Sequence, residues 1–495
     1  MLKPSFSEFM TMAKQGNLIP VYKKFLADTE TPVSAYLKLR DKSYSYLLES
    51  ADGGNRWGRY SFIGYKPFLT VLSYDREMEI RNGQESKILK DVVNPIDVLR
   101  EINDQFKPVN VNGLPPFQGG LVGCFNYDLI RKWERLPGIQ PDNPNLPESI
   151  FTASRRMVIF DHLTHKIIVA AFAYLEDDRN LLSAYTRACQ EVDETLKDLQ
   201  RPLSAALDND TVHVSELQPN MEKKTFEDIV VKAKEHIKAG DVIQVVLSQK
   251  LSGSLSGEPF KLYRNLRSIN PSPYMFYLNF EDVKLIGASP EILIRLTDGL
   301  IELRPIAGTR PRGETPDADR SFGEELLADP KEKAEHIMLV DLGRNDVGKV
   351  SMPGSVIVPR LMEIERYSHV MHIVSRVEGT LKDDMDSFDL FMSAFPAGTV
   401  SGAPKIRAME IISELEPAAR GSYAGAVGYF GFNGNMDFCI TIRTIAVTDG
   451  HLSIQVGAGI VADSTPAGEY VETIKKATAM IQSIKEAGIH DTYDR

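Results

Sequence analysis

The sequence has few cysteines and no long apolar segment. The three cysteines are Cys124, Cys189 and Cys439, and they form no CxxC pair. This argues against a thiolate zinc site and a disulfide framework, and free thiols suit a reducing cytoplasm, where we expect the protein to reside. The chain lacks an uninterrupted apolar stretch of about 18 residues, and its first residues lack the apolar core of a signal peptide. We therefore expect neither a membrane span nor an export signal.

Basic residues are outnumbered by acidic ones. The chain has 57 Lys and Arg against 68 Asp and Glu, a formal net charge of −11. Nucleic acids and anionic membranes select basic surfaces, so we expect neither as a partner, although a local basic pocket for a small anion is compatible with this balance. A length of 495 residues predicts several domains of roughly 100–200 residues or one large fold.

The sequence changes character near residue 200. Residues 203–220 are polar and carry no helical stripe, which indicates a linker or a surface strand. We therefore expect an N-terminal part, residues 1–205, and a C-terminal part, residues 220–495. Helices and strands do not alternate regularly in either part, which predicts an α+β fold. The predicted helices are Pro95–Phe106, Arg179–Leu199, Lys224–Lys238, Pro330–Leu342, Pro404–Leu415 and Pro466–Lys485.

Two pairs of glutamates lie three residues apart on predicted helices. Glu332 and Glu335 share one helical face, and Glu469 and Glu472 share another. If the two faces meet, each close carboxylate pair repels by roughly 3 kcal/mol at about 5 Å and an effective dielectric of 20. Such a cluster needs a cation or raised pKa values, and oxygen ligands favour Mg²⁺. The same spacing is common on solvated helices, so spacing alone leaves both interpretations open.

Two glycine-containing segments are candidates for ligand contact. In the segment Phe395–Lys405, Gly398 and Gly402 permit close backbone approach before a predicted helix. This segment is either an anion-binding loop that offers the Thr399 hydroxyl, or a tight turn with Ser401 as a helix cap. Gly457 and Gly459 alternate in a predicted strand, which also indicates close approach. No GxGxxG, P-loop or GxSxG motif accompanies them, so nucleotide binding and serine hydrolysis lack support.

Several single side chains are candidates for chemistry. Glu291 lies at a strand boundary, and His372 lies in an apolar stretch, where it is either a core residue or a catalytic one. Arg443 lies within a predicted strand, residues 439–447, where a charge is costly unless it pairs with an anion. Two further candidates cannot be told from ordinary core or surface residues by composition: Tyr423 and Lys476.

Five segments of the C-terminal part together resemble the chorismate-utilising enzymes. Their order and spacing agree with that family from Pro305 to Thr473. They are PIAGTRPRG (305–313), EHIMLVDLGRND (335–346), PAGTVSGAPK (396–405), GSYAGAVGY (421–429) and GAGIVADSTPAGEYVET (457–473). The resemblance implies a large core of two β-sheets packed as a sandwich and flanked by helices.

The N-terminal part narrows the resemblance to the large subunits of anthranilate synthases. It contains YLLES (46–50), RYSFIG (59–64) and GGLVGCFNYD (119–128). In those enzymes the LLES strand and the NPSPYMF segment line a feedback site for tryptophan. The resemblance therefore implies that Glu49 and Ser50 contact the amino group or backbone of tryptophan. Residues expected to enclose its indole are Pro273, Tyr274 and Met275. The alternative is that LLES is only a strand that ends at Ser50.

Two positions distinguish members of the family. Isochorismate and salicylate synthases carry a lysine that activates water where this chain has Gln244. Many aminodeoxychorismate synthases carry a nucleophilic lysine where this chain has Ala307. Neither residue can act in those ways, which leaves ammonia as the direct nucleophile. Aminodeoxychorismate synthase component I stays the alternative, because some of its members lack the lysine. A scaffold that only senses ligands is a third possibility.

The resemblance also implies a role for each candidate residue. Glu335 and Glu472 bind Mg²⁺ with Glu332 and Glu469 beside them, and the metal holds the ring carboxylate of chorismate. Glu291 is the general acid, His372 supports the loss of pyruvate, and Thr309 is an active-site threonine, with Thr399 as a second candidate. The residues expected to hold the enolpyruvyl carboxylate are Tyr423, Arg443, Gly457, Gly459 and Lys476.

The implied reaction converts chorismate and ammonia to anthranilate and pyruvate. It is the first committed step of tryptophan biosynthesis and is inhibited by tryptophan. Cys124 lacks the Gly-flanked elbow that a glutaminase nucleophile needs. The resemblance therefore implies a separate glutamine amidotransferase subunit, anthranilate synthase component II, which supplies ammonia within a heterotetramer.

Overall fold

The computed structural model describes residues 2–40, 43–50, 58–83, 85–137, 146–175, 180–203, 211–367 and 370–488. Its helices are α1 (Phe6–Met12), α2 (Pro32–Leu39), α3 (Pro95–Asp104), α4 (Leu181–Leu199), α5 (Lys223–Ala239), α6 (Phe260–Ile269), α7 (Pro316–Ala328), α8 (Pro330–Val350), α9 (Ser387–Ala394), α10 (Gly398–Ser401), α11 (Lys405–Leu415), α12 (Pro466–Gly488) and the 3₁₀ helix η1 (Tyr127–Lys132).

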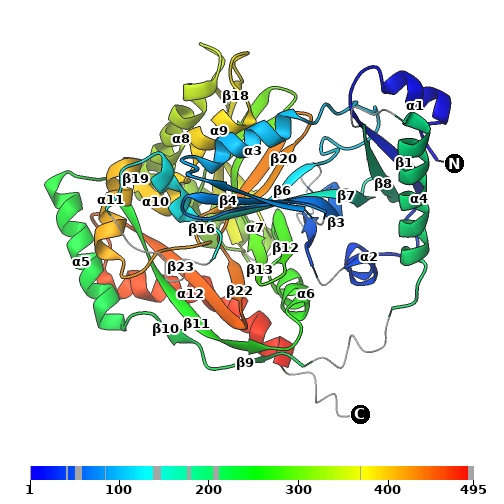
Figure 1. Cartoon of the computed structure of the whole chain (residues 1–495). Coiled ribbons are helices and arrows are strands. Elements are labelled where there is room, and N and C mark those ends of the chain that lie inside the picture. Colours follow the sequence, from blue (N-terminus) through cyan, green and yellow to red (C-terminus); the bar gives the residue numbers. More distant parts are fainter. Residues whose placement is uncertain are drawn as a thin grey trace.

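The strands outnumber the helices and lie at the centre of the molecule, with helices around them (Figure 1). They are β1 (Leu18–Leu26), β2 (Ser45–Glu49), β3 (Tyr60–Ser73), β4 (Glu77–Asn82), β5 (Glu85–Lys90), β6 (Gly120–Phe125), β7 (Ser149–Asp161), β8 (Lys166–Tyr174), β9 (His213–Val214), β10 (Gln218–Pro219), β11 (Gln244–Ser256), β12 (Tyr274–Phe280), β13 (Val283–Ser289), β14 (Ile292–Thr297), β15 (Leu300–Leu303), β16 (Ile306–Pro311), β17 (Ile357–Arg366), β18 (Val370–Thr380), β19 (Gly402–Ala403), β20 (Ala426–Gly431), β21 (Met436–Ile440), β22 (Thr444–Thr448) and β23 (His451–Ile460).

The strands form two antiparallel layers that share two long strands. The first layer runs β1-β8-β7-β3-β2-β12-β13-β22-β23-β11. The second runs β5-β4-β3-β7-β6-β20-β21-β14-β15-β18, and β16 and β17 also pair with β18. The early half of β3 pairs with β2 and its late half with β4, so β3 passes from one layer to the other. This confirms the predicted α+β sandwich.

The two parts of the chain build these layers together. Strand β2 of the N-terminal part pairs with β12, and β6 pairs with β20. One hydrophobic core contains side chains from both layers, such as Phe276 of β12 and Phe438 of β21. A second core packs the first layer against helices including α6 and α12. Both parts therefore contribute to the same sheets and cores.

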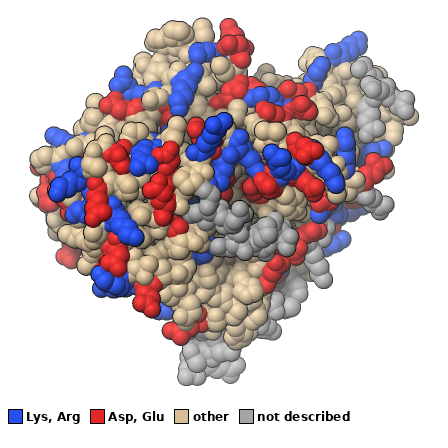
Figure 2. All heavy atoms as spheres, turned by 60° about the vertical axis from the view of Figure 1, so that its left-hand side comes forward, with Lys and Arg blue, Asp and Glu red and all other residues tan. Residues whose placement is uncertain are grey.

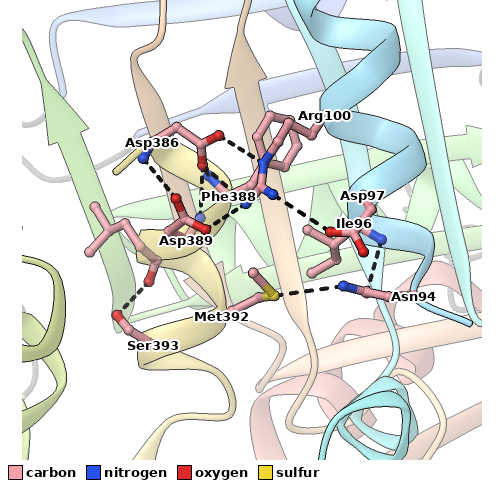
Figure 3. Close-up of polar contacts among 10 residues, drawn as sticks. Asn94, Ile96, Asp97, Arg100, Asp386, Phe388, Asp389, Met392 and Ser393 are labelled. Carbon is pink, nitrogen blue, oxygen red and sulfur yellow. Dashed lines mark hydrogen bonds and ion pairs between the residues drawn. The ribbon is translucent and has the colours of Figure 1, made fainter. Parts of the chain in front are cut away.

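A contact between α3 and α9 also joins the two parts (Figure 3). Arg100 of α3 forms ion pairs with Asp386, the N-cap of α9, at 2.8 Å and with Asp389 at 2.6 Å. The side-chain amide of Asn94 lies 3.9 Å from the sulfur of Met392. Helix α9 leads directly into the segment Phe395–Lys405, so this contact fixes the start of that segment.

The predicted helices are present, with local differences. Proline begins several of them, and Gly240 ends α5 in the left-handed conformation with φ of 84°. Helix α8 continues to Val350, past the predicted end at Leu342, although its last turns contain Gly343 and Gly348. Burial of Val347 and Val350 offsets the low helix propensity of those glycines.

The polar stretch near residue 203 is only partly described. Its second half contains β9 and β10, which both pair with β11. All three cysteines are free, as predicted. None of the described helices combines the length and the apolar character that a membrane span requires. Acidic and basic side chains are interspersed over the face shown in Figure 2.

Candidate active site

Glu291 lies between β13 and β14, where the chain passes from the first layer to the second. Its carbonyl accepts a hydrogen bond from the backbone of Ile440 at 3.0 Å, and the Ser289 hydroxyl donates to the Ile440 carbonyl at 2.7 Å. Burial raises the pKa of Glu291 to about 7, while the nearby Thr399 hydroxyl and the charge of Lys476 oppose this rise. The carboxyl group can therefore carry a proton near neutral pH, as a general acid must.

The segment Phe395–Lys405 brings Thr399 to Glu291. Gly398 faces Leu342 so closely that a Cβ at this position would lie 1.9 Å from its side chain. The Lys405 amine donates to Asp346 at 2.8 Å and to the carbonyl of Pro396 at 3.2 Å, which holds the turn from inside. Ser401 donates to the carbonyl of Ala397 at 2.8 Å, and Pro404 is the N-cap of α11. The alternative prediction that Ser401 caps this helix is therefore wrong.

His372 and Thr309 lie opposite each other on β18 and β16. A β-bulge between Ala307 and Thr309 turns Gly308, with φ of 66°, toward the histidine. Nδ1 of His372 donates to the Gly308 carbonyl at 2.9 Å, and the Thr309 hydroxyl lies 3.1 Å from the same nitrogen. Burial lowers the pKa of His372. A neutral ring with its proton on Nδ1 has Nε2 as its basic atom.

Tyr423, Lys476 and Arg443 surround the glycine-containing strand β23. A Cβ on Gly457 would lie 2.4 Å from the Tyr423 hydroxyl, so only glycine allows this contact. The Lys476 amine donates to the Gly457 carbonyl at 2.9 Å and pairs with Glu472 at 2.7 Å. These contacts bring the phenol of Tyr423 and the ammonium group of Lys476 next to the backbone of Gly457, which has no side chain.

Arg443 differs from its sequence prediction. It lies between β21 and β22 in the left-handed conformation, with φ of 51°, rather than inside one continuous strand. Its guanidinium donates to the Lys476 carbonyl at 2.7 Å. A non-glycine residue in this conformation costs about 1 kcal/mol or more, and such strain clusters at functional sites. Burial lowers the pKa of Arg443, opposed by the charges of Tyr423 and Glu472.

The two acidic pairs come within electrostatic reach of each other. Burial raises the pKa of Glu335, and the charges of Glu332 and Glu472 raise it further. Burial also raises the pKa of Glu469, again with a contribution from Glu472. Within the described ranges, no three His, Cys, Asp or Glu side chains converge closely enough to enclose a metal ion. Glu332 instead pairs with Arg310 at 3.2 Å. The carboxylates thus repel one another, and a hard cation is the ligand that would relieve this repulsion.

The five residues that were predicted to contact tryptophan all line a cavity of about 220 Å³, apart from the candidate active site. Glu49 and Ser50 border it from the end of β2, while Pro273, Tyr274 and Met275 border it from the start of β12. The Ser50 hydroxyl is buried without a hydrogen-bond partner. The Glu49 carboxylate accepts hydrogen bonds from Tyr263 at 2.5 Å and Arg267 at 3.0 Å. Further lining residues include Tyr60, Phe62, Phe117, Tyr429, Arg295 and Asp437.

Sequence analysis missed two groups of charged residues at these sites. Arg295 pairs with Asp437 at 2.7 Å, and both bond the Tyr274 hydroxyl, although 142 residues separate the arginine from the aspartate. Glu416 and Arg420 form a buried ion pair behind Tyr423. The only sequence signal for the second pair was an i,i+4 spacing, which is common on solvated helices.

Known proteins are similar to this chain over most of its length. Residues 43–482 match the chorismate binding enzyme family. Anthranilate synthase component 1 of Acetivibrio thermocellus is 47% identical over 99% of both chains, and that of Synechocystis sp. is 49% identical over 98% of this chain and 99% of that one. The crystal structure of anthranilate synthase component I from Streptococcus pneumoniae superimposes with a TM-score of 0.77 at 35% identity, covering 92% of this chain and 99% of that chain.

More distant structures share the fold. The isochorismate synthase MenF of Escherichia coli has a TM-score of 0.71 at 17% identity, over 97% of this chain and 98% of that one. The family match spans most of the chain, and the relatives at 47–49% identity extend over nearly all of it. The chain therefore belongs to the chorismate binding enzymes and, among them, to the anthranilate synthase component 1 family.

Proposed function

We propose that the protein converts chorismate and ammonia to anthranilate, pyruvate and water. The observation that carries the proposal is Glu291, a carboxyl group with a pKa of about 7 beside Thr399 and Lys476. In the first stage ammonia bonds to a ring carbon, and the ring hydroxyl leaves as water with the proton of Glu291. The raised pKa suits this role, because a carboxyl group with its usual pKa is ionised at neutral pH.

His372 is suited to the second stage. The enolpyruvyl group leaves when the ring C–O bond breaks, the ring becomes aromatic by losing a proton, and a proton gained by the methylene carbon of the leaving group gives pyruvate. With Nδ1 held by the Gly308 carbonyl, Nε2 of the neutral imidazole is the atom that accepts this proton. Thr309 contacts the same Nδ1 and helps to fix the ring. The two stages therefore use one acid and one base from different strands.

We further propose that the four glutamates bind Mg²⁺. The raised pKa values of Glu335 and Glu469 support this, because each arises in part from a neighbouring carboxylate. When bound, the ion would neutralise these charges and hold the ring carboxylate of chorismate. Glu332 would have to exchange its pairing with Arg310 for this role.

The other end of the substrate would bind beside β23. The enolpyruvyl carboxylate is an anion, and Arg443, Lys476 and the Tyr423 hydroxyl offer it charges and hydrogen bonds. Two residues near the site support ammonia, and not water or a protein side chain, as the proposed nucleophile. Gln244 lies against Gly459, where a Cβ would be 2.4 Å from its amide nitrogen, and carries no basic group; Ala307 is buried on β16 and carries no nucleophile.

Tryptophan is the proposed occupant of the cavity beside β12. Its aromatic lining and its paired charges fit an aromatic amino acid with a carboxylate and an ammonium group. A glutamine amidotransferase is the proposed partner, in a heterotetramer, since relatives are named component 1 and a second component is implied. This partner would release ammonia from glutamine and pass it to the site.

The test uses the purified chain with chorismate, Mg²⁺ and an ammonium salt at mildly alkaline pH. We expect equal amounts of anthranilate and pyruvate, with both suppressed by EDTA and by tryptophan. Consumption of chorismate without pyruvate would favour aminodeoxychorismate formation instead. No consumption, even with a glutamine amidotransferase component and glutamine added, would reject the proposed function.

A further inference from the structure

Glu416 and Arg420 form an ion pair that is almost completely buried, with side-chain exposures of 2% and 1%. Nε of Arg420 donates to Oε2 of Glu416 at 2.9 Å, and Nη2 donates to Oε1 at 2.6 Å. Removing two charges from water costs several kcal/mol for each ion, which good geometry and further hydrogen bonds must offset. Burial of such a pair is thus weak support for a role in stability, and its other contacts indicate what it does.

Arg420 connects three segments of the candidate active site. Nη1 donates to the carbonyl of Val400 at 2.7 Å, directly after Thr399 in the chain. Nη2 donates to the carbonyl of Val246 at 2.7 Å, and Val246 pairs with Gly459 across β11 and β23. The guanidinium also lies over the ring of Tyr423, at 5.5 Å. The Arg420 side chain therefore contacts the turn at Thr399, strand β11, which pairs with the glycines of β23, and the ring of Tyr423.

Glu416 completes the connection from its other side. Its Oε1 accepts hydrogen bonds from the backbone N–H of Ser248 at 2.7 Å and from the Ser248 hydroxyl at 2.9 Å. Ser248 pairs with Gly457 across β11 and β23. The ion pair thus contacts β11 at both residues that lie opposite Gly457 and Gly459.

We propose that Glu416 and Arg420 are positioning residues, which fix Thr399, Tyr423 and the Gly457–Gly459 strand in the mutual arrangement that chorismate requires. The proposal rests on the proposed function, because it takes these residues as the binding and acid-supporting groups. Lysine cannot replace the arginine. Its single nitrogen cannot reach the Val400 carbonyl, the Val246 carbonyl and the Glu416 carboxylate in the fork geometry that guanidinium provides.

The test compares Arg420→Lys and Glu416→Gln with the wild-type chain. For Arg420→Lys we expect kcat/KM for chorismate to fall by about 100-fold, with KM rising at least about 10-fold, because misplacement by about 1 Å can cost this much. Amide hydrogen exchange should accelerate at residues 399–402 and 457–459 and stay unchanged in the sheet formed by β4 and β5. Glu416→Gln keeps the shape and most hydrogen bonds, so it should give a smaller effect of the same kind.

The matched control is Arg156→Lys. Arg156 is also a buried arginine in an ion pair, with Glu194 at 2.6 Å, but it joins β7 to α4. The substitution Arg156→Lys should lower Tm and leave KM for chorismate unchanged. If Arg420→Lys behaves like this control, with lower Tm but unchanged KM and local exchange, the inference is wrong. If it does not fold, Glu416→Gln decides by the same readouts. Failure of the wild-type chain to consume chorismate would reject the proposed function, whereas the exchange pattern would still decide whether the pair fixes these segments.

Discussion

The candidate active site and the cavity beside β12 differ in how their charges are balanced. In the active site, burial and neighbouring carboxylates raise the pKa values of Glu335 and Glu469, and burial raises that of Glu291. In the cavity, Glu49 accepts bonds from Tyr263 and Arg267, and Arg295 pairs with Asp437. The candidate active site thus contains carboxyl groups that repel one another, whereas the charged side chains of the cavity are paired with one another.

On the proposed function, this difference would distinguish a site for chemistry from a site for binding. Groups with shifted pKa values can exchange protons near neutral pH, and repelling carboxylates attract a cation. A cavity with paired charges and aromatic walls selects a ligand by shape and hydrogen bonding. Substitutions in the two regions should therefore have different consequences, and the following predictions test this from the largest effect to the smallest.

Replacing the proposed acid should have the largest effect. Glu291→Gln removes the titrating proton but keeps the shape, so we expect turnover to fall by about 10²–10⁴-fold, the range for loss of a general acid. Anthranilate formation with ammonium as nitrogen source is the measurement. Inhibitor binding in the other cavity, followed by calorimetry with tryptophan, should not change. Near-normal turnover would show that another group supplies the proton.

Glu335→Gln should weaken the binding of Mg²⁺. We expect the half-saturating Mg²⁺ concentration to rise by about 100-fold, at the upper end of what the loss of even a supporting group costs. Without Mg²⁺ the variant should have a higher Tm than the wild type, because a repelling carboxylate is gone. Glu324→Gln, at an exposed position of α7, is the control. Equal Mg²⁺ titrations for all three chains would contradict the proposed metal site.

Gly457→Ala should damage substrate binding. The added Cβ would lie 2.4 Å from the Tyr423 hydroxyl and 2.9 Å from the Leu247 carbonyl, so the strand or the tyrosine must move. We expect kcat/KM to fall by about 10–100-fold, mainly through KM. Gly348→Ala is the control: in α8 the new Cβ meets no atom within 4 Å. It should leave kinetics unchanged and stabilise the helix by about 0.5–1 kcal/mol.

Ser50→Phe should separate the two regions. A phenyl group would occupy part of the 220 Å³ cavity, so we expect the inhibition constant for tryptophan to rise about 10-fold or more, within the usual range of about 1–3 kcal/mol for coupled sites. Turnover without tryptophan should stay normal. Ser86→Phe, on the exposed strand β5, is the control. Unchanged sensitivity to tryptophan would contradict the assignment of this cavity as the tryptophan site.

The last prediction concerns the stability of the fold and its dependence on pH, and its measurement does not involve turnover. Folding raises the pKa of Glu291 from 4.5 to about 7, so the folded chain keeps a proton that the unfolded chain loses between these values. The wild type therefore loses stability as pH rises through this window, and Glu291→Gln does not. At pH 8 the variant should be the more stable by at most about 3 kcal/mol, and at pH 4 the two should be equal. Urea unfolding at both pH values is the measurement, and parallel curves would contradict the raised pKa.

Local features of the fold could be predicted from the sequence. Proline in the first turn indicated where several helices begin, and Gly240 indicated where α5 ends, because both residues act on the backbone within a few residues. The glycine pair of β23 and the acidic pairs of α8 and α12 were recognisable for the same reason. Resemblance to a known family then assigned them roles, which spacing alone did not.

Features that depend on distant segments were not predictable. Arg443 looked like a strand residue, but tertiary contacts hold it in a left-handed conformation between β21 and β22. The Arg295–Asp437 pair joins residues far apart in the chain, and the Glu416–Arg420 pair gains its meaning from contacts to Val400 and Val246. Composition and periodicity carry no information on such pairings.

The pairing of early strands with late strands has a consequence for synthesis. During translation the first 200 residues emerge before the strands with which they pair. Strand β2 therefore stays unpaired on one side until β12 is made, and β6 stays so until β20 is made. Until then these strands expose unpaired edges, which other chains can join. Pairing over such sequence separations is slow, because the closure of long loops precedes the contacts that reward it. The nascent chain should therefore depend on chaperones until its last strands leave the ribosome.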